Sequence, residues 1–229
     1  MKFPWTKAKS TDPIVSEYEE KSRLRRMNRK APLSSVRFVV LDAETSGFDK
    51  RNDRMLSLAA FEVTDNRISI QNMCSWTIFQ SNASLTEAVK VHGILPDETM
   101  QGQQEYVVMR ELIPFLTGAV VVGHHIGFDA MMIDMGLQRH FGISFCNPIV
   151  DTADLAMRAL DAFAQTGYAN QRPPSLDEVC SQCDIEMWLR HTAEGDAFTT
   201  AELFLYLCAK RRKLLGKELL LKDLPIRKY

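Results

Sequence analysis

Acidic residues stand at three places in this chain of 229 residues where their spacing could support metal chemistry. Asp42 and Glu44 are two residues apart, Asp129 stands near the middle of the chain, and Asp196 follows His191 by five positions. In an extended chain, residues i and i+2 point to the same face about 7 Å apart, so Asp42 and Glu44 can converge on one cation. Mg²⁺ is bound by a few carboxylate oxygens together with water and substrate phosphates. The acidic residues therefore predict a divalent-cation site that acts on phosphate groups.

The imidazole of His191 adds the acid–base function that such a site needs. Its unperturbed pKa near 6.5 suits a general base that takes a proton from water. Each stretch alone is a weak signal, because an Asp-x-Glu pair commonly lies in a solvated turn and an Asp in a first helical turn is favoured by the helix dipole. Together, four carboxylates and one imidazole in the order Asp, Glu, Asp, His, Asp match a two-metal phosphoryl-transfer site.

The elements that must position these residues can be read from hydrophobic periodicity. Residues 36–41 are apolar and β-branched and predict a buried strand that ends at Asp42. Residues 55–64 and 68–79, joined by a turn at 65–67, predict an antiparallel meander with that first strand. Further strands are expected at 119–122 and ending at 149–150, with helices over 14–28, 84–91, 103–117, 127–141, 151–160, 176–183 and 194–215. The expected fold is α/β, a mixed five-stranded sheet flanked by helices, with its ligand site at the strand ends.

Composition and charge narrow the class of protein. Hydrophobic residues make up 45% and charged residues 25% of the chain, as in soluble globular proteins. No apolar run approaches the ~20 residues of a membrane span, the first thirty residues lack a secretory signal, and the five scattered cysteines fit a reducing compartment. A cytoplasmic location is therefore expected.

The net charge of −1 is unevenly distributed along the chain. Residues 1–37 and 210–229 together carry a net charge of +12, whereas residues 38–209 carry −13. The basic ends either bind a polyanion or are solvated helix faces. We expect a basic N-terminal extension over 1–35, a catalytic domain over 36–215 and a basic C-terminal tail over 216–229.

Three motifs resemble, in order, those of the DEDDh (DnaQ-like) 3′–5′ exonucleases, a family that includes the epsilon proofreading subunit of bacterial DNA polymerase III. They are residues 41–47, 123–129 and 191–196. Residues 91–94 also resemble a family segment beside the terminal nucleotide, and 149–152 and 175–177 lie where the family has comparable stretches. The resemblance covers about 36–210 and implies a ribonuclease H-like fold. His125 stands where the family usually has Asn.

The resemblance implies a role for each candidate catalytic residue. Asp42, Glu44 and Asp196 would hold one of two divalent ions, Mg²⁺ or Mn²⁺. Asp42 would bridge to the second ion, which Asp129 would support. His191 would take the proton from the attacking water, and a nucleoside monophosphate would leave.

The resemblance also indicates which residues cradle the last nucleotide. The candidates for this substrate-binding role are Thr45, Ser46, Phe48, His92 and Phe128. Phe128 could equally be a core residue.

The substrate is most simply the 3′ end of single-stranded DNA, in proofreading or repair, with a DNA polymerase as a possible partner. RNA 3′-end trimming is an alternative, because discrimination depends on contacts to one 2′-hydroxyl that the sequence does not reveal. A non-catalytic accessory that binds nucleic acid or a polymerase through the basic ends is a third interpretation. The oligomeric state is not indicated.

Two other features have structural interpretations. Cys180 and Cys183 form a C-x-x-C without a second pair at zinc-finger spacing, which predicts two buried thiols. His124 and His125 are expected to be packed or bonded to the backbone, and Trp188 is expected to be a packing anchor.

Overall fold

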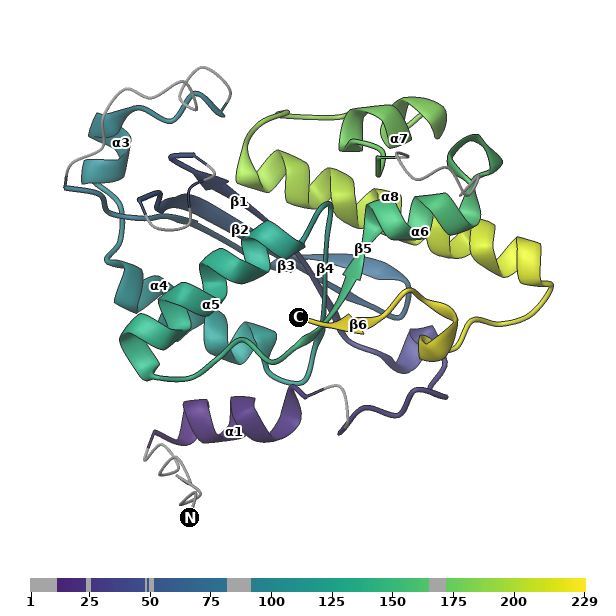
Figure 1. The fold of residues 1–229 in the computed structure, drawn as a ribbon, viewed down its shortest axis with the longest axis horizontal. Coiled ribbons are helices and arrows are strands. Elements are labelled where there is room, and N and C mark those ends of the chain that lie inside the picture. Colours follow the sequence, from purple (N-terminus) through teal and green to yellow (C-terminus); the bar gives the residue numbers. More distant parts are fainter. Residues whose placement is uncertain (1–11, 24–25, 48, 50–51, 82–91, 165–171) are drawn as a thin grey trace, which may run out of the picture.

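A mixed sheet lies in the middle of the molecule, between two layers of helices (Figure 1). The computed structural model describes residues 12–23, 26–47, 49, 52–81, 92–164 and 172–229. The six strands lie in the order β3-β2-β1-β4-β5-β6. Their bounds are β1 Phe38–Thr45, β2 Met55–Thr64, β3 Arg67–Thr77, β4 Val120–Gly123, β5 Pro148–Asp151 and β6 Arg227–Lys228.

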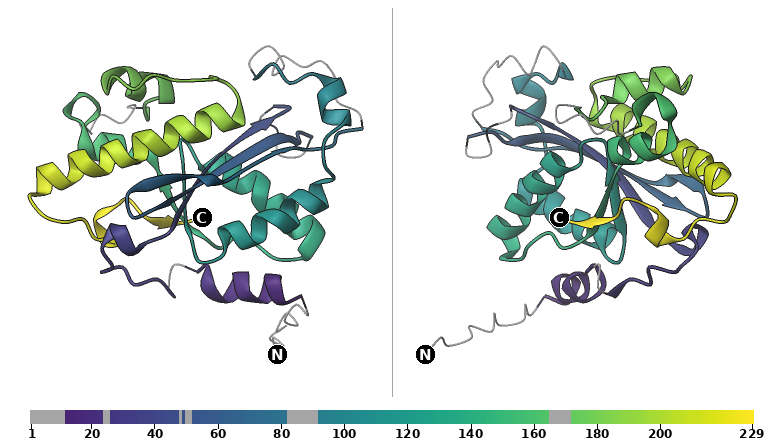
Figure 2. Two further views of the ribbon diagram at one scale, coloured as in Figure 1. Left: turned by 180° about the vertical axis from the view of Figure 1, so that it is seen from behind. Right: turned by 45° about the vertical axis from the view of Figure 1, so that its right-hand side comes forward.

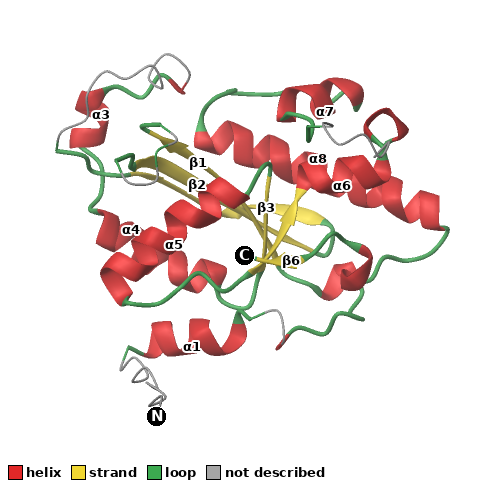
Figure 3. Cartoon of the chain, viewed as in Figure 1, coloured by secondary structure: helices red, strands yellow, loops and turns green. Residues whose placement is uncertain are grey.

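After the first three strands, helices separate each further strand from the one before it (Figure 3). Their bounds are α1 Pro13–Lys21, α3 Pro96–Met100, α4 Glu105–Leu116, α5 Gly127–Phe141, α6 Thr152–Ala159, α7 Leu176–Gln182 and α8 Ala193–Leu215, with short 3-10 turns η2 Leu33–Ser35, η3 Asp161–Phe163 and η4 Leu221–Asp223. Among the described residues, no helix combines the length and apolar character needed to cross a bilayer. The helix predicted over 84–91 lies outside the described residues.

The predicted meander is confirmed: β1 pairs with β2 and β2 with β3, both antiparallel. Asp65 and Asn66 form the β2–β3 turn with φ of 49° and 56°, and such a two-residue turn with both φ positive matches the twist of the paired strands. β1, β4 and β5 are parallel to one another. Their carboxyl ends therefore lie at the same edge of the sheet.

Alternation along β1 assigns its residues to two different cores. Val39 and Leu41 point into a core with α1, α4 and α5, whereas Phe38 and Val40 point into a core with α6, α7 and α8. The two helical layers are visible from behind and from the side in Figure 2. Because side chains alternate with period 2, Asp42 continues the Phe38–Val40 series and faces α8. This alternation directs the acidic end of β1 toward the helix that carries the third motif.

The described residues form a sheet of six strands rather than the five predicted. β6 adds two residues at the edge, antiparallel to β5. Arg227 and Lys228 show no apolar alternation, so nothing in their local pattern indicates a strand. The segment before them is packed, because Leu219, Leu221 and Leu224 are buried.

The described residues of the expected N-terminal extension also pack on the domain. α1 ends at Lys21, earlier than the helix predicted over 14–28, and its Val15 and Tyr18 are buried in the core with α4 and α5. Further along, the backbone N–H of Leu33 donates to Leu219 O at 3.1 Å, and that of Leu221 donates to Ala31 O at 2.9 Å. We call these paired segments, residues 29–33 and 219–222, the terminal clasp.

Candidate active site

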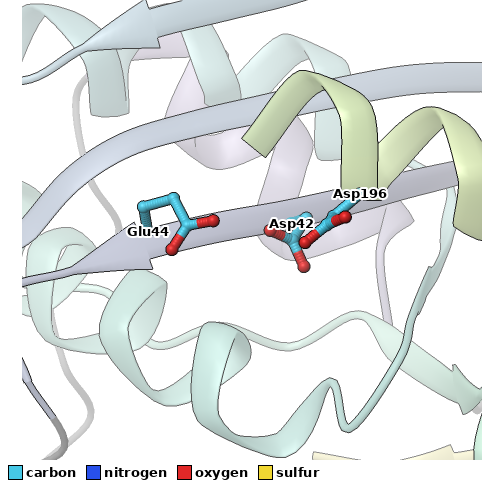
Figure 4. A group of neighbouring side chains, drawn as sticks. All are labelled: Asp42, Glu44 and Asp196. Carbon is cyan, nitrogen blue, oxygen red and sulfur yellow. The ribbon is translucent and has the colours of Figure 1, made fainter. Parts of the chain in front are cut away.

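Three carboxylates from two elements meet at the carboxyl end of β1. Asp42 and Glu44 lie on β1, and Asp196 lies in the first turn of α8, which Thr192 caps by accepting the Gly195 N–H at 3.1 Å. One carboxylate oxygen from each of the three lies within 4.8 Å of the others. Figure 4 shows the three carboxyl groups turned toward one another. A bulge on β2 opposite the Glu44–Thr45 junction interrupts the register here, as is common beside active sites.

The fourth predicted carboxylate adjoins this group from α5. Asp129 lies in the first turn of α5, as expected, and is buried. Burial, followed by the charge of Asp129, raises the pKa of Asp42 well above its usual range. Burial also raises the pKa of Asp129, although backbone hydrogen bonds from its own N–H and that of Ala43 oppose the shift. The structure therefore gathers four acidic side chains from three widely separated segments of the chain.

The electrostatics of this acidic cluster, residues 42, 44, 129 and 196, favour a bound cation. Burial and the neighbouring Asp196 raise the pKa of Glu44 to about 7. Burial raises the pKa of Asp196 as well, and its buried Oδ1 has no hydrogen-bond partner among the described residues. Buried carboxylates that repel one another are stabilised by protons or by cations, and oxygen ligands suit hard divalent ions. The residues present therefore fit the divalent ions that the motif order predicts.

A basic side chain of the protein contacts the acidic cluster. The Arg190 guanidinium donates to Asp196 Oδ2 and forms two further hydrogen bonds to Asp177, at 3.0 Å and 2.7 Å. Its charge lowers the pKa values of Asp42, Glu44 and Asp196, against the larger effect of burial. Sequence reasoning missed Arg190. The available signal was a basic residue directly before His191 in an acidic stretch.

His191 lies in the loop that enters α8, half-buried, with a left-handed φ of 64°. The charge of His191 lowers the pKa of Asp196. This effect is smaller than that of burial, which raises the pKa, and smaller than that of Arg190, which also lowers it. His191 is therefore electrostatically coupled to the acidic cluster. Its role as general base stays a prediction.

The two histidines after β4 are bonded to the backbone, as predicted, with His124 half-buried and His125 exposed. The His124 ring lies between Thr152 Oγ1 at 2.8 Å and the Pro174 carbonyl oxygen at 2.9 Å. Burial and the neighbouring His125 lower the pKa of His124 to about 4. His125 has a φ of 57° and its Nε2 lies 3.1 Å from the same Pro174 oxygen. Both rings join the end of β4 to the segment before α7.

Two of the residues expected to cradle a nucleotide, Thr45 and Ser46, lie at the end of β1 and directly after it. Thr45 Oγ1 donates to Gly47 O at 2.9 Å, and Ser46 Oγ donates to Asp53 Oδ1 at 2.7 Å. These hydrogen bonds hold the turn after β1 against the start of β2. Phe48 lies outside the described residues.

The two remaining candidates, His92 and Phe128, lie far from β1 in the sequence. His92 is buried, its Nδ1 accepts the Ile94 N–H at 3.0 Å, and its Nε2 has no partner among the described residues. Burial lowers the pKa of His92. Phe128 is partly buried against the core of α4 and α5. The substrate-binding roles of these residues stay predictions.

The prediction for Trp188 is wrong, and that for the C-x-x-C is confirmed. Trp188 is 62% exposed and its neighbour Leu189 is 72% exposed, so neither anchors the core. Both lie in the loop between α7 and α8, where the backbone turns to meet α8 and leaves their side chains outside. Cys180 and Cys183 are buried free thiols.

Comparison with known proteins identifies similar chains. Residues 39–204 match the family model of the RNase T exonucleases. The chain is 27% identical over 83% of its length to a DNA polymerase III of PolC type from Lacticaseibacillus paracasei, and 30% identical over 78% to a DNA polymerase III subunit epsilon-like protein from Rhodobacter capsulatus. It is 25% identical to the DNA polymerase III subunit epsilon of Treponema pallidum, over 79% of this chain and 80% of that one.

Most of these relatives are much longer. The chain spans 12% of the Lacticaseibacillus paracasei protein and 24% of the Rhodobacter capsulatus protein.

Among solved structures, E. coli exonuclease I in complex with a dT13 oligonucleotide superposes with a TM-score of 0.65 at 20% identity, over 80% of this chain and 43% of that one. Exonuclease I from Methylocaldum szegediense gives 0.61 at 20% identity, over 80% and 41%. These structures share the fold.

Proposed function

Because the chain belongs to the RNase T family of exonucleases, we propose that it is a metal-dependent 3′–5′ exonuclease that removes nucleoside monophosphates from 3′ ends. The observation that carries this proposal is the meeting of Asp42, Glu44 and Asp196 within 4.8 Å at the carboxyl end of β1. Open α/β sheets bind their ligands at this edge. The catalytic unit is proposed to span residues 36–215, flanked by the basic segments 1–35 and 216–229.

The acidic cluster supplies the ligands for two divalent ions, Mg²⁺ or Mn²⁺. Asp42, Glu44 and Asp196 would hold one ion, and Asp42 and Asp129 would hold the second. When bound, two such ions stabilise negative charge on the attacking and the leaving oxygens of a phosphodiester. Asp196 Oδ1 supports this assignment, because a buried carboxylate oxygen without a hydrogen-bond partner is costly unless a ligand satisfies it.

His191 is the proposed general base. Its imidazole would accept the proton of the attacking water, a role that histidine fills more often than any other side chain. The electrostatic effect of His191 on Asp196 supports a position beside the cluster. Thr45, Ser46, Phe48, His92 and Phe128 would hold the terminal nucleotide.

The proposed substrate is the 3′ end of single-stranded DNA. The fold shared with an exonuclease I bound to a dT13 oligonucleotide supports this choice, and the similarity to epsilon subunits supports a DNA polymerase as a possible partner. RNA trimming remains the alternative, and a matched RNA strand in the test separates the two.

The test uses one strand labelled at its 5′ end, the same strand labelled at its 3′ end, and an RNA of the same sequence, each with Mg²⁺, Mn²⁺ or EDTA. We expect a ladder from the 5′-labelled DNA, early release of a labelled mononucleotide from the 3′-labelled DNA, and no cleavage in EDTA. Asp42→Ala and His191→Ala should each lower kcat at least about 100-fold, the scale of lost metal or acid–base catalysis. Leu214→Ala, an exposed residue near the far end of α8, is the control. Wild-type rates in Asp42→Ala would refute the proposal.

A further inference from the structure

We propose that Trp188, together with Leu189, is a stacking platform for unpaired bases of the substrate strand. This inference rests on the proposed function, because it assigns a binding surface beside the same acidic cluster. It concerns the loop between α7 and α8, which leads into the amino-terminal end of α8 (Figure 1).

The exposure of these side chains is the first observation. Trp188 is 62% exposed and Leu189 is 72% exposed, side by side in the chain. Tryptophan is largely buried on average in folded proteins, and adjacent large apolar side chains in solvent commonly mark a binding surface. The other tryptophan that the structure describes, Trp76, is buried and donates to Glu111 Oε2 at 2.7 Å.

The second observation is that the backbone of this pair is fixed beside Asp196. A Cβ added to Gly195 would lie 2.2 Å from Leu189 O and 2.4 Å from Trp188 O, so both carbonyl groups pack directly on the residue that precedes Asp196. Leu189 has a left-handed φ of 50°, a conformation that persists only when its surroundings impose it. The platform is thus held at a set position relative to the cluster.

Arg190 provides the third observation, because its side chain connects the loop to both α7 and α8. Its guanidinium contacts Asp196 and forms two hydrogen bonds to Asp177. Trp188 is therefore two residues from a side chain that touches the acidic cluster. A strand whose terminal phosphodiester reached the cluster would pass close to this loop.

An unpaired base is the occupant that fits these observations. Stacking on an aromatic ring needs an open base face and tolerates any sequence, which suits an exonuclease that meets every base in turn. In a duplex the base faces are already stacked on their neighbours. The platform therefore favours single strands over duplex ends.

The test measures binding of the full chain to a labelled single-stranded DNA by fluorescence anisotropy in EDTA, which prevents cleavage. Loss of one stacked base predicts that Trp188→Ala raises Kd roughly 5- to 150-fold, while Trp188→Phe retains most of the affinity. Leu214→Ala, 59% exposed and eighteen residues beyond Asp196 on the same helix, should bind as the wild type does. A blunt duplex should show little difference between Trp188→Ala and the wild type. Thermal melting of the variants verifies that each is folded.

A scan of single abasic sites along the strand identifies the stacked base. In the wild type, one abasic position should weaken binding, and that position should have no further effect in Trp188→Ala. Equal Kd values and equal abasic profiles for the two proteins would overturn the inference. The same scan on RNA shows whether the platform also accepts ribonucleotides.

The two proposals fail in different ways. If the wild type degrades DNA but Trp188→Ala has an unchanged KM and abasic profile, the platform is wrong and the nuclease assignment stands. If the wild type binds DNA through Trp188 but cleaves no strand with any divalent ion, the nuclease assignment fails and the platform stands.

Discussion

At Asp196, the Arg190 guanidinium and the proposed metal ion would share one carboxylate. Oδ2 accepts from Arg190, while Oδ1 is buried without a partner among the described residues. Arg190 is itself positioned by two hydrogen bonds to Asp177. The guanidinium therefore offsets part of the repulsion within the acidic cluster before an ion arrives, and its contribution should shrink once an ion supplies that charge.

Replacing Arg190 should show how its contribution differs between the metal-free and the metal-bound protein. Arg190→Met leaves the buried Asp196 without its cationic partner, so we expect the metal-free free energy of unfolding to fall by about 1–3 kcal/mol. In Mn²⁺ the loss should be smaller, so the ion should raise the Tm of the variant more than that of the wild type. Differential scanning calorimetry with EDTA or Mn²⁺ measures both. Arg172→Met is the control, because Arg172 pairs with Glu178 on the exposed surface. Equal Mn²⁺-induced shifts in wild type and Arg190→Met would contradict the shared role of Asp196.

Glu44 should make the stability of the metal-free protein depend on pH. Burial and the charge of Asp196 raise its folded-state pKa from 4.5 to about 7. Between these two values the folded state binds more protons than the unfolded state, so the free energy of unfolding falls as the pH rises. Glu44→Gln removes this titration and should lose less stability between about pH 5 and about pH 8. Urea denaturation in EDTA measures the profiles. Parallel profiles for the two proteins would show that Glu44 has an ordinary pKa.

At the scale of elements, the entry to α8 sets the position of both the acid and the proposed base. Thr192 caps the helix, and the loop before it packs on Gly195. Leu189 and His191 both adopt left-handed φ, at 50° and 64°. Local strain of this kind clusters at functional sites. The absence of a side chain at position 195 is what allows this close approach.

A methyl group at position 195 should therefore disturb the site. Gly195→Ala would place Cβ 2.2 Å from Leu189 O, against backbone that cannot rotate away. We expect a loss of about 1–3 kcal/mol or more in the free energy of unfolding, as for overpacked sites. Gly127→Ala is the matched control, because a methyl group at that position would point into open space and alanine favours a helix. Urea denaturation compares the two variants. A Gly195→Ala protein as stable as Gly127→Ala would show that the loop can move away.

Local patterns predicted the elements that carry the acids but not the contacts between loops. The period of β1 places Asp42 and Glu44 on one face, and the apolar pattern up to Leu215 marks α8. Such signals depend only on neighbouring residues. The pairing of Arg190 with Asp177 depends instead on a loop whose sequence has no periodicity. For this reason the local patterns did not predict that pairing, and the prediction that Trp188 is a packing anchor was wrong.

Local patterns also failed to predict the contacts between the two ends of the chain. Leu33 and Leu219 are far apart in sequence, yet a backbone hydrogen bond of 3.1 Å joins their segments. Neither segment has the length or alternation that indicates a strand. The sixth strand was missed for the same reason.

At the scale of the whole molecule, the terminal clasp and the acidic cluster lie at opposite ends of β1. The terminal clasp lies just before the start of β1, whereas the acidic cluster lies near its end, about 20 Å away along the strand at 3.3 Å per residue. Figure 2 shows α1 and the edge that carries α3 on opposite sides of the molecule. A strand held at the cluster by its 3′ end must therefore extend along the length of β1 before its phosphates reach the terminal clasp.

This separation predicts that the salt dependence of binding grows with strand length. Arg29, Lys30 and Lys222 are exposed on the clasp, where the Lys222 N–H donates to Arg29 O at 2.8 Å. Each phosphate contact adds about 0.7 to the slope of log K against log salt for a single strand. Replacing all three residues with Ser should lower that slope by about 2 for a strand of about twenty nucleotides and leave it unchanged for one of about five. Anisotropy titrations in EDTA over a range of NaCl concentrations measure the slopes. A loss of equal size for both strands would mean that the clasp acts through the general field of the protein. No loss for either would mean that the clasp does not contact the strand.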